Sequence, residues 1–182
     1  MQEAPLFHRL YGDALNRLPS PIVKLHDISG PRTWHGEAQV SQGGSRAARL
    51  ICRLLGFPPP ADRVKLTVTM EPAGEGEIWR RRFGVHPMTT TLKAGALPGS
   101  VEERFWPFAA VSRVDADTAG VTQVLVALRV FGLPLPRWLW PKLDVRESAD
   151  GTRYRFSVTA AFPGGAFIGH YEGWLETGQA HG

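Results

Sequence analysis

Three segments of the sequence alternate between apolar and polar residues, as strands with one buried face do. Each segment carries a charged residue on its apolar face: Arg81, Glu103 or Glu147. The aromatic residues that share these faces are Trp79, Phe83 and Phe105. If the faces point into a core, the charges must pair, because an isolated buried charge costs several kcal/mol. We therefore expect Arg81 to pair with Glu103 or with Glu147.

A charge pair among aromatic side chains permits two interpretations. The functional one is a polar anchor inside a pocket for a small apolar molecule. The structural one is an ion pair without a ligand, or a register shift of one residue that places the charges in solvent. Tyr171, on the apolar face of the last strand segment, completes this candidate lining.

A proline-bounded segment at residues 131–141 contains Trp138 and Trp140 and cannot form a long regular element. One interpretation is a rigid lid over the core. The others are the lip of a ligand pocket and a contact with a membrane surface, since tryptophan prefers the headgroup level of a bilayer. The arginine face of a helix at residues 45–55 could join such a contact by attracting anionic lipid. A basic outer face on a core helix is the commoner arrangement.

Common catalytic motifs are absent from the sequence, which contains no nucleophile elbow, phosphate loop, zinc-protease motif or dinucleotide fingerprint. His170 and Glu172 share one strand face, which we expect to be solvated rather than metal-binding. The arginines of residues 80–82 alternate between two faces, so they form no basic groove for nucleic acid. We expect no metal, no cofactor and no nucleic-acid partner, and a binding protein rather than an enzyme.

Composition sets the broad class of the protein. The 182 residues carry a net charge of +4, which is a small surplus. Of the 21 basic residues 17 are arginine, an excess over lysine that a high-GC genome would produce without a functional reason. The single cysteine, Cys52, excludes an internal disulfide and fits a reducing compartment. Without a visible signal peptide or membrane span, we expect a cytoplasmic location. No shift in composition interrupts the chain, so we expect one domain over residues 1–182 with its core at 6–176.

The periodicity of apolar residues predicts the order of the elements. Spacings of three and four predict helices at 5–18 and 45–55, with a bridging stretch at 22–27. Ser45 can cap the second helix. We expect that helix to bury Ala47, Leu50, Ile51, Leu54 and Leu55, opposite Arg46, Arg49 and Arg53. A period of two, punctuated by Gly and Pro, predicts strands at 34–42, 64–70, 77–83, 86–93, 101–115, 121–131, 143–147, 153–162 and 167–176.

The short connections between these strands favour an antiparallel sheet. The predicted fold is α+β: a curved antiparallel sheet of seven to nine strands forming a closed or half-closed barrel, with two helices near the N-terminus. A sheet this long usually curls, and a helix can cover one end. We prefer a lipocalin-like barrel over a helix-grip domain, because helix-grip domains end in a long helix and this chain ends in a strand.

Several short motifs follow one another along the chain. They are Leu10-Tyr11-Gly12, Leu18-Pro19, His26, Gly36 to Gly43, Trp79-Arg-Arg-Arg-Phe83-Gly84, Glu103-Arg104-Phe105, Gly132-Leu-Pro-Leu-Pro136, Pro141, Glu147, Asp150-Gly151, Phe156 and Tyr171-Glu-Gly-Trp-Leu175. In this order they resemble the bacterial family called domain of unknown function 4166, over residues 6–175. The chain departs from the family pattern at Val85 and Trp106, where the family has glycine.

The resemblance implies a context rather than an activity. Domains of this family occur alone or joined to the C-terminal side of saccharopine-dehydrogenase-like, nicotinamide-binding domains, and no activity is established for them. Our preferred hypothesis is non-catalytic binding of a small apolar or amphipathic ligand inside the barrel. One alternative is an accessory domain that docks on a nicotinamide-dependent oxidoreductase. The other is a cofactor-free enzyme with Glu103 or Glu147 as acid or base, which pairing with Arg81 would disfavour by stabilising the ionised carboxylate.

Overall fold

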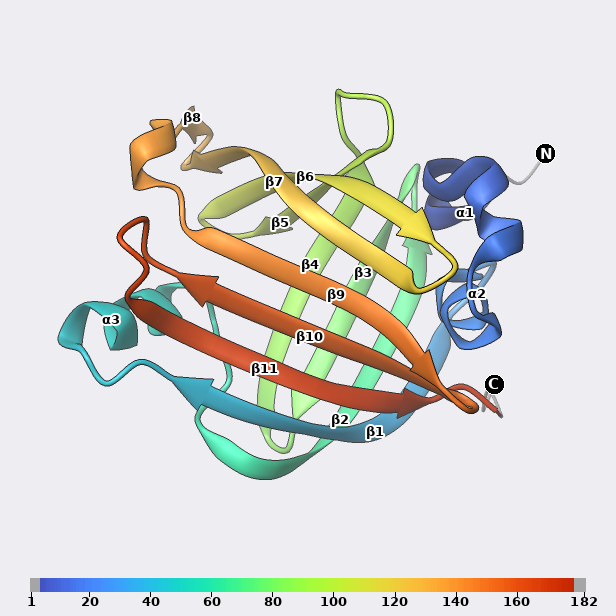
Figure 1. The fold of residues 1–182 in the computed structure, drawn as a ribbon, viewed down its shortest axis with the longest axis horizontal. Helices are drawn as coiled ribbons and strands as arrows, with labels where there is room; N and C mark the ends of the chain where they lie inside the picture. The colour runs from blue at the N-terminus through green and yellow to red at the C-terminus, as the bar shows by residue number, and fades with distance from the viewer. Residues whose placement is uncertain (1–3, 179–182) are drawn as a thin grey trace.

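The computed structural model describes residues 4–178, and one antiparallel sheet of eleven strands dominates it (Figure 1). The strands follow the order β6-β5-β4-β3-β2-β1-β11-β10-β9-β7-β8, and the pairing of β6 with β7 closes ten of them into a barrel. The barrel strands are β1 (Arg32–Gln42), β2 (Ala61–Ala73), β3 (Gly76–Phe83), β4 (His86–Ala94), β5 (Ser100–Phe105), β6 (Phe108–Asp117), β7 (Gly120–Val130), β9 (Lys142–Asp150), β10 (Arg153–Ala161) and β11 (Phe167–Glu176). The short β8 (Leu133–Pro134) pairs with the end of β7, outside the barrel.

The α+β barrel is confirmed, but the expected count of seven to nine strands was too low. Residues 101–115 form two strands rather than one, because a turn at Trp106-Pro107 folds β6 back on β5. A proline cannot donate to the hydrogen-bond ladder, which explains the end of the strand at this position. The second additional strand is β8, in the segment that we expected to be an irregular loop.

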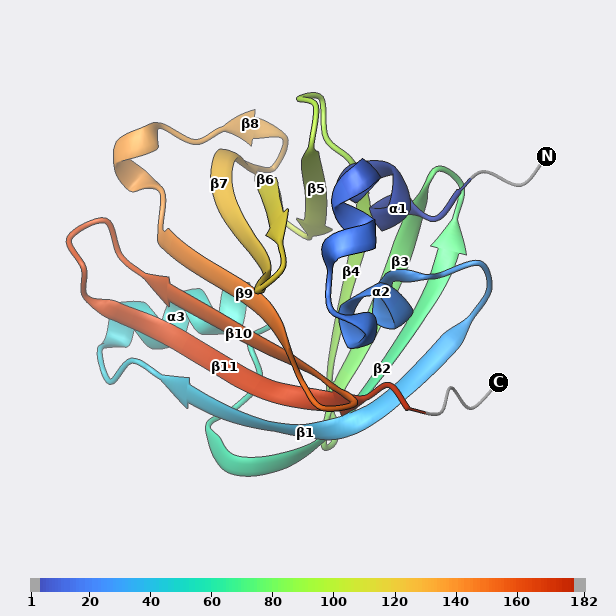
Figure 2. The same cartoon turned by 45° about the vertical axis from the view of Figure 1, so that its right-hand side comes forward.

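The helices before the barrel also differ from the expectation. The predicted helix at 5–18 is broken into α1 (Leu6–Tyr11) and a 3₁₀ helix, η1 (Gly12–Arg17), because Gly12 takes a positive φ of 50°. The expected bridging stretch is a third helical segment, α2 (Ser20–His26), which begins with a proline in its first turn. Together, these segments pack against β4, β6, β9 and β10 and occupy one end of the barrel (Figure 2).

The helix predicted at 45–55 is present as α3 (Arg46–Leu54), and Ser45 caps it by accepting a hydrogen bond from the Ala48 amide at 3.0 Å. Its buried face is only partly the predicted one. Ile51 packs against the core and Leu55 lines the internal cavity, but Ala47, Leu50 and Leu54 are exposed. The small residues Ala48 and Cys52 pack against β1 and β11 instead. Close packing explains the difference: the Cys52 thiol donates to the Ile168 carbonyl, an approach that a larger side chain would prevent.

The barrel therefore has two different ends (Figures 1 and 2). At the capped end lie α1, η1, α2 and the turns that follow β2, β4, β6 and β9. At the opposite end, named the α3 end, lie the connections at 43–60, 84–85, 106–107, 131–141 and 162–166. Within residues 4–178, no helix is both long and apolar enough to cross a membrane.

Candidate functional site

A cavity of about 160 Å³ lies inside the barrel. Its wall takes side chains from every barrel strand except β1, and from α1, α2 and the segment after α3. Most of these side chains are aliphatic or aromatic. The polar or charged ones are Arg81, Glu103, Ser112, Gln123, Arg146, Glu147, Tyr154 and Tyr171.

The structure brings seven of the nine candidate residues from the sequence to this wall. They are Trp79, Arg81, Phe83, Glu103, Phe105, Glu147 and Tyr171. The alternating pattern in β3, β5 and β9 explains the result, because residues two apart in a strand face the same side of a sheet. Whether these residues bind a ligand stays a prediction.

Arg81, near the end of β3, is the centre of a group of polar contacts. Its guanidinium donates to the Thr90 hydroxyl at 2.9 Å and to Glu103 Oε1 at 3.3 Å, and it lies 4.9 Å from the centre of the Trp79 ring. The arginine side chain is 11% exposed and that of Glu103 is 30% exposed. Of the two predicted partners, Arg81 thus takes Glu103, which lies across the intervening strand β4.

Tyr171 from β11 lies close enough to Arg81 and Glu103 for both charges to influence its pKa. Burial raises the pKa of Tyr171 to about 12, since the phenolate would lose its water; Arg81 lowers this pKa and Glu103 raises it. The ring also contacts Phe57, Phe83 and Phe156 at centroid distances of 5.2–6.0 Å. Tyr171 is therefore a neutral side chain at working pH, with an aromatic face against the cavity.

Glu147, the other candidate partner of Arg81, contacts His26 instead. His26, at the end of α2, places Nε2 2.7 Å from Glu147 Oε2, and both residues are buried. The sequence hypothesis missed His26 because it did not treat 22–27 as helical. In a helix, His26 lies one turn after Ile22 and shares its apolar face. That spacing was the available signal.

Further titratable side chains surround the His26–Glu147 pair beneath α1 and α2. The Trp79 indole donates to Glu77 Oε2 at 2.8 Å, and burial raises the pKa of Glu77 despite this hydrogen bond. Burial likewise raises the pKa of Tyr11 and of Tyr154, and the charge of Glu147 raises both further. The Tyr11 hydroxyl and the other His26 nitrogen, Nδ1, are buried without a hydrogen-bond partner among residues 4–178.

Trp138 and Trp140 are not brought to the cavity. Trp138 lies in a short 3₁₀ helix, η2 (Arg137–Leu139), and is 73% exposed. The Trp140 indole donates to the Leu135 carbonyl at 2.7 Å, and the Arg137 guanidinium lies 5.5 Å from its ring centre. The segment is therefore closed on itself at the α3 end, beside β8 (Figure 1).

The side chains that line the cavity differ in exposure. Phe7, Leu25 and Leu175, beneath the N-terminal helices, are at most 2% exposed. Phe105 and Leu143 are only half-buried. Strands β7 and β9 pair over only three residue pairs, and their ribbons then diverge (Figure 2).

The chemistry available at this wall is hydrogen bonding within an apolar enclosure. Arg81 and Glu103 present donors and an acceptor whose formal charges cancel. Within residues 4–178, no group of three or more His, Cys, Asp or Glu side chains is arranged to hold a metal ion. The fold and the cavity thus define a closed antiparallel β-barrel with an internal apolar pocket.

A comparison with known protein families identifies the family of this chain. The family described as Domain of unknown function (DUF4166) matches residues 18–175, and the chain belongs to this family. The resemblance noted from the sequence motifs is therefore confirmed. No curated protein matches the chain.

Proposed function

We propose that this barrel binds a small, neutral, amphipathic molecule in its internal cavity, without chemical transformation. The observation that carries the proposal is a cavity of about 160 Å³ whose mostly apolar wall contains the partly buried Arg81–Glu103 pair. Apolar pockets with a few fixed polar groups are the usual form of small-molecule sites.

Cavity size restricts the ligand. An engineered apolar cavity of roughly 150 Å³ accommodates benzene, so a single ring or a short chain fits and a long fatty acid does not. The wall also restricts its polar group. Because Glu103 already balances Arg81, an anionic group would be left with an unbalanced charge, whereas a hydroxyl or carbonyl group can hydrogen-bond to the pair.

A matched set of single-ring probes tests the proposal. We expect phenol to bind more tightly than toluene, which lacks the hydroxyl, and more tightly than benzoate, which is charged. Calorimetry or ligand-observed NMR measures the three affinities. Equal binding of all three probes, or binding of none, would overturn the proposal.

Two neighbouring alanines of β6 provide a control for location. Ala110 lines the cavity and is 8% exposed, whereas Ala109 is half-buried and faces away from it. Ala110→Phe fills the cavity and should abolish phenol binding, and the smaller Ala110→Leu should weaken it. Ala109→Phe should leave the affinity unchanged; if it weakens binding as much as Ala110→Phe does, phenol binds elsewhere.

A further inference from the structure

Exposed hydrophobic side chains gather at one end of this barrel. Of the eleven large hydrophobic residues that are exposed within the described structure, all but Leu97 and Val124 lie in or beside the α3-end connections. Trp106 is 84% exposed, Trp138 is 73% exposed and Val85 is 97% exposed. Single exposed hydrophobic residues are common on proteins, but their concentration on one end indicates a surface that contacts something apolar.

Part of this surface is rigid. The rings of Trp106 and Phe131 pack edge to face at a centroid distance of 5.5 Å, and the Phe131 amide donates to the Pro107 carbonyl at 2.9 Å. The turn at 106–107 and the start of segment 131–141 are therefore held together. An aromatic pair fixed in this way presents its apolar area without a large loss of side-chain freedom on binding.

The connections at this end carry only basic charged side chains, and the exposed Asp62 follows them in the second position of β2. The five connections contain Arg46, Arg49, Arg53 and Arg137, and no Asp or Glu. Among residues 4–178, none of the four arginines forms an ion pair. On α3, moreover, the exposed Leu50 and Leu54 lie among these arginines, so apolar and cationic groups share one face.

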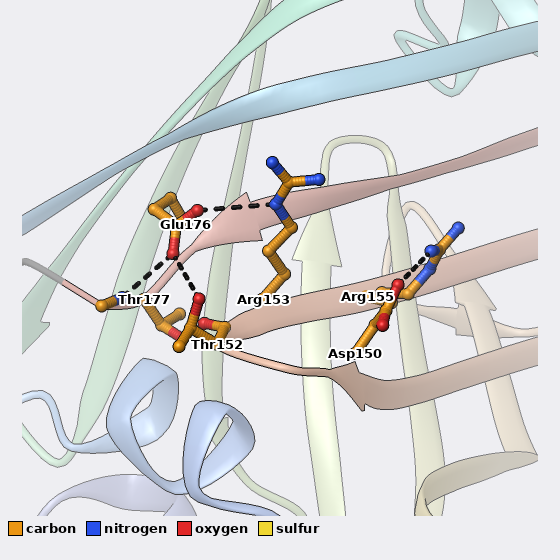
Figure 3. Close-up of polar contacts among 7 residues, drawn as sticks. Asp150, Thr152, Arg153, Arg155, Glu176 and Thr177 are labelled. Carbon is orange, nitrogen blue, oxygen red and sulfur yellow. Dashed lines mark hydrogen bonds and ion pairs between the residues drawn. The ribbon is translucent and has the colours of Figure 1, made fainter.

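The capped end differs from the α3 end because it carries acidic side chains as well as basic ones. There, acidic side chains take part in local polar contacts, as Figure 3 shows at the turn between β9 and β10. Glu176 accepts hydrogen bonds from Thr152 at 3.0 Å and from Arg153 at 3.5 Å, and Asp150 accepts one from Arg155 at 2.9 Å. The barrel is thus asymmetric along its axis in both charge and exposed apolar area.

From this asymmetry, we infer that the α3 end docks on the surface of an anionic lipid bilayer. Tryptophan prefers the headgroup level, exposed leucines can reach the acyl boundary, and unpaired arginines attract anionic headgroups. A nucleic acid would use the arginines but not the exposed aliphatic side chains.

Flotation with vesicles of defined composition tests this inference on the whole chain. We expect the protein to float with vesicles in which about a third of the phosphatidylcholine is replaced by phosphatidylglycerol, and far less with pure phosphatidylcholine. High salt should weaken the binding, since it screens exposed charges. Failure to float with the anionic vesicles would overturn the docking inference and leave the cavity proposal intact.

Substitutions at the α3 end test whether this end makes the contact with the vesicles. The double variant Trp106→Ser/Trp138→Ser and the double variant Arg46→Gln/Arg53→Gln should each weaken vesicle binding by roughly tenfold or more. Leu97→Ser is the matched control, because Leu97 is 56% exposed at the capped end, and it should bind as the wild type does. Circular dichroism verifies that each variant is folded.

Other occupants of this surface would give other results. Equal loss with Leu97→Ser would place the contact elsewhere and overturn the inference. A concentration-dependent dimer without flotation, abolished by the tryptophan double variant, would assign the surface to a second copy of the chain. Binding to polyglutamate without flotation would assign it to an acidic protein.

Discussion

His26 Nε2 lies 2.7 Å from Glu147 Oε2, although 121 positions separate the two residues. This contact joins the last turn of α2 to the middle of β9, and both side chains are at most 5% exposed. It therefore connects the N-terminal helices to the barrel wall beside the cavity, which Glu147 also lines. A buried hydrogen bond of this kind specifies one position for the helices, because no water can replace a lost partner.

Removal of the imidazole should destabilise the protein strongly. His26→Ala leaves the Glu147 carboxylate buried without this partner and opens space beside Phe7, so we expect a loss of about 3 kcal/mol in the free energy of unfolding. Glu147→Gln keeps a hydrogen-bonding oxygen and should cost about 1 kcal/mol. Urea unfolding measures both. A His26→Ala variant as stable as the wild type would show that the contact does not hold the helices.

The Arg81–Glu103 pair should show energetic coupling. Arg81→Met leaves the Thr90 hydroxyl and the Glu103 carboxylate without their donor, so we expect a loss of about 2 kcal/mol. Glu103→Gln alone should cost about 1 kcal/mol, and the double variant should cost less than the sum of the two. A double-mutant cycle from denaturant unfolding gives the coupling energy. Additive effects would mean that the two side chains act independently.

The three tyrosines of the sequence should resist ionisation in the folded protein. Burial raises the pKa of Tyr171 to about 12 and raises those of Tyr11 and Tyr154 well above 10.0. Because the folded pKa values exceed the unfolded ones, the associated stability is complete below the unfolded value and is lost as pH rises through the folded values.

Ultraviolet titration of the phenolate band measures this directly. At a pH just above 10.0, the native protein should show little phenolate absorbance, whereas protein in urea should titrate all three tyrosines near their ordinary pKa. Alkaline unfolding should accompany the phenolate signal of the native protein. A full three-tyrosine titration of the folded protein near pH 10.0 would contradict the burial of these hydroxyls.

Gly36 should not tolerate a side chain. It lies in the middle of β1, paired with Leu66 and Leu175, and a Cβ at this position would overlap the carbonyl oxygen of Trp174. Gly36→Ala must separate β1 from β11, so we expect a loss of about 2–4 kcal/mol in unfolding free energy. Gly30→Ala is the control, since a Cβ there meets no heavy atom within 4 Å. Similar thermal stability of the two variants would contradict the close approach.

The fold was predictable to the extent that local pattern determines it. Alternation in the strands and glycine or proline between them predicted the antiparallel barrel, and the inward face of Arg81 followed from the period of two. The family motifs were also visible along the chain. The division of residues 101–115 into β5 and β6 was not visible in the sequence. Trp106-Pro107 lies within a continuous apolar pattern, and only the pairing of Phe105 with Phe108 reveals the turn.

Only the tertiary structure shows which side chains pair with each other. The sequence limited Arg81 to Glu103 or Glu147 but could not choose between them, since register and barrel closure decide which strands lie side by side. His26 was hidden because its helix is short and its partner lies 121 residues away. The buried face of α3 likewise depends on the close approach of β11 to Cys52. Periodicity in a sequence identifies which side chains share a face, whereas only the packed chain determines what that face meets.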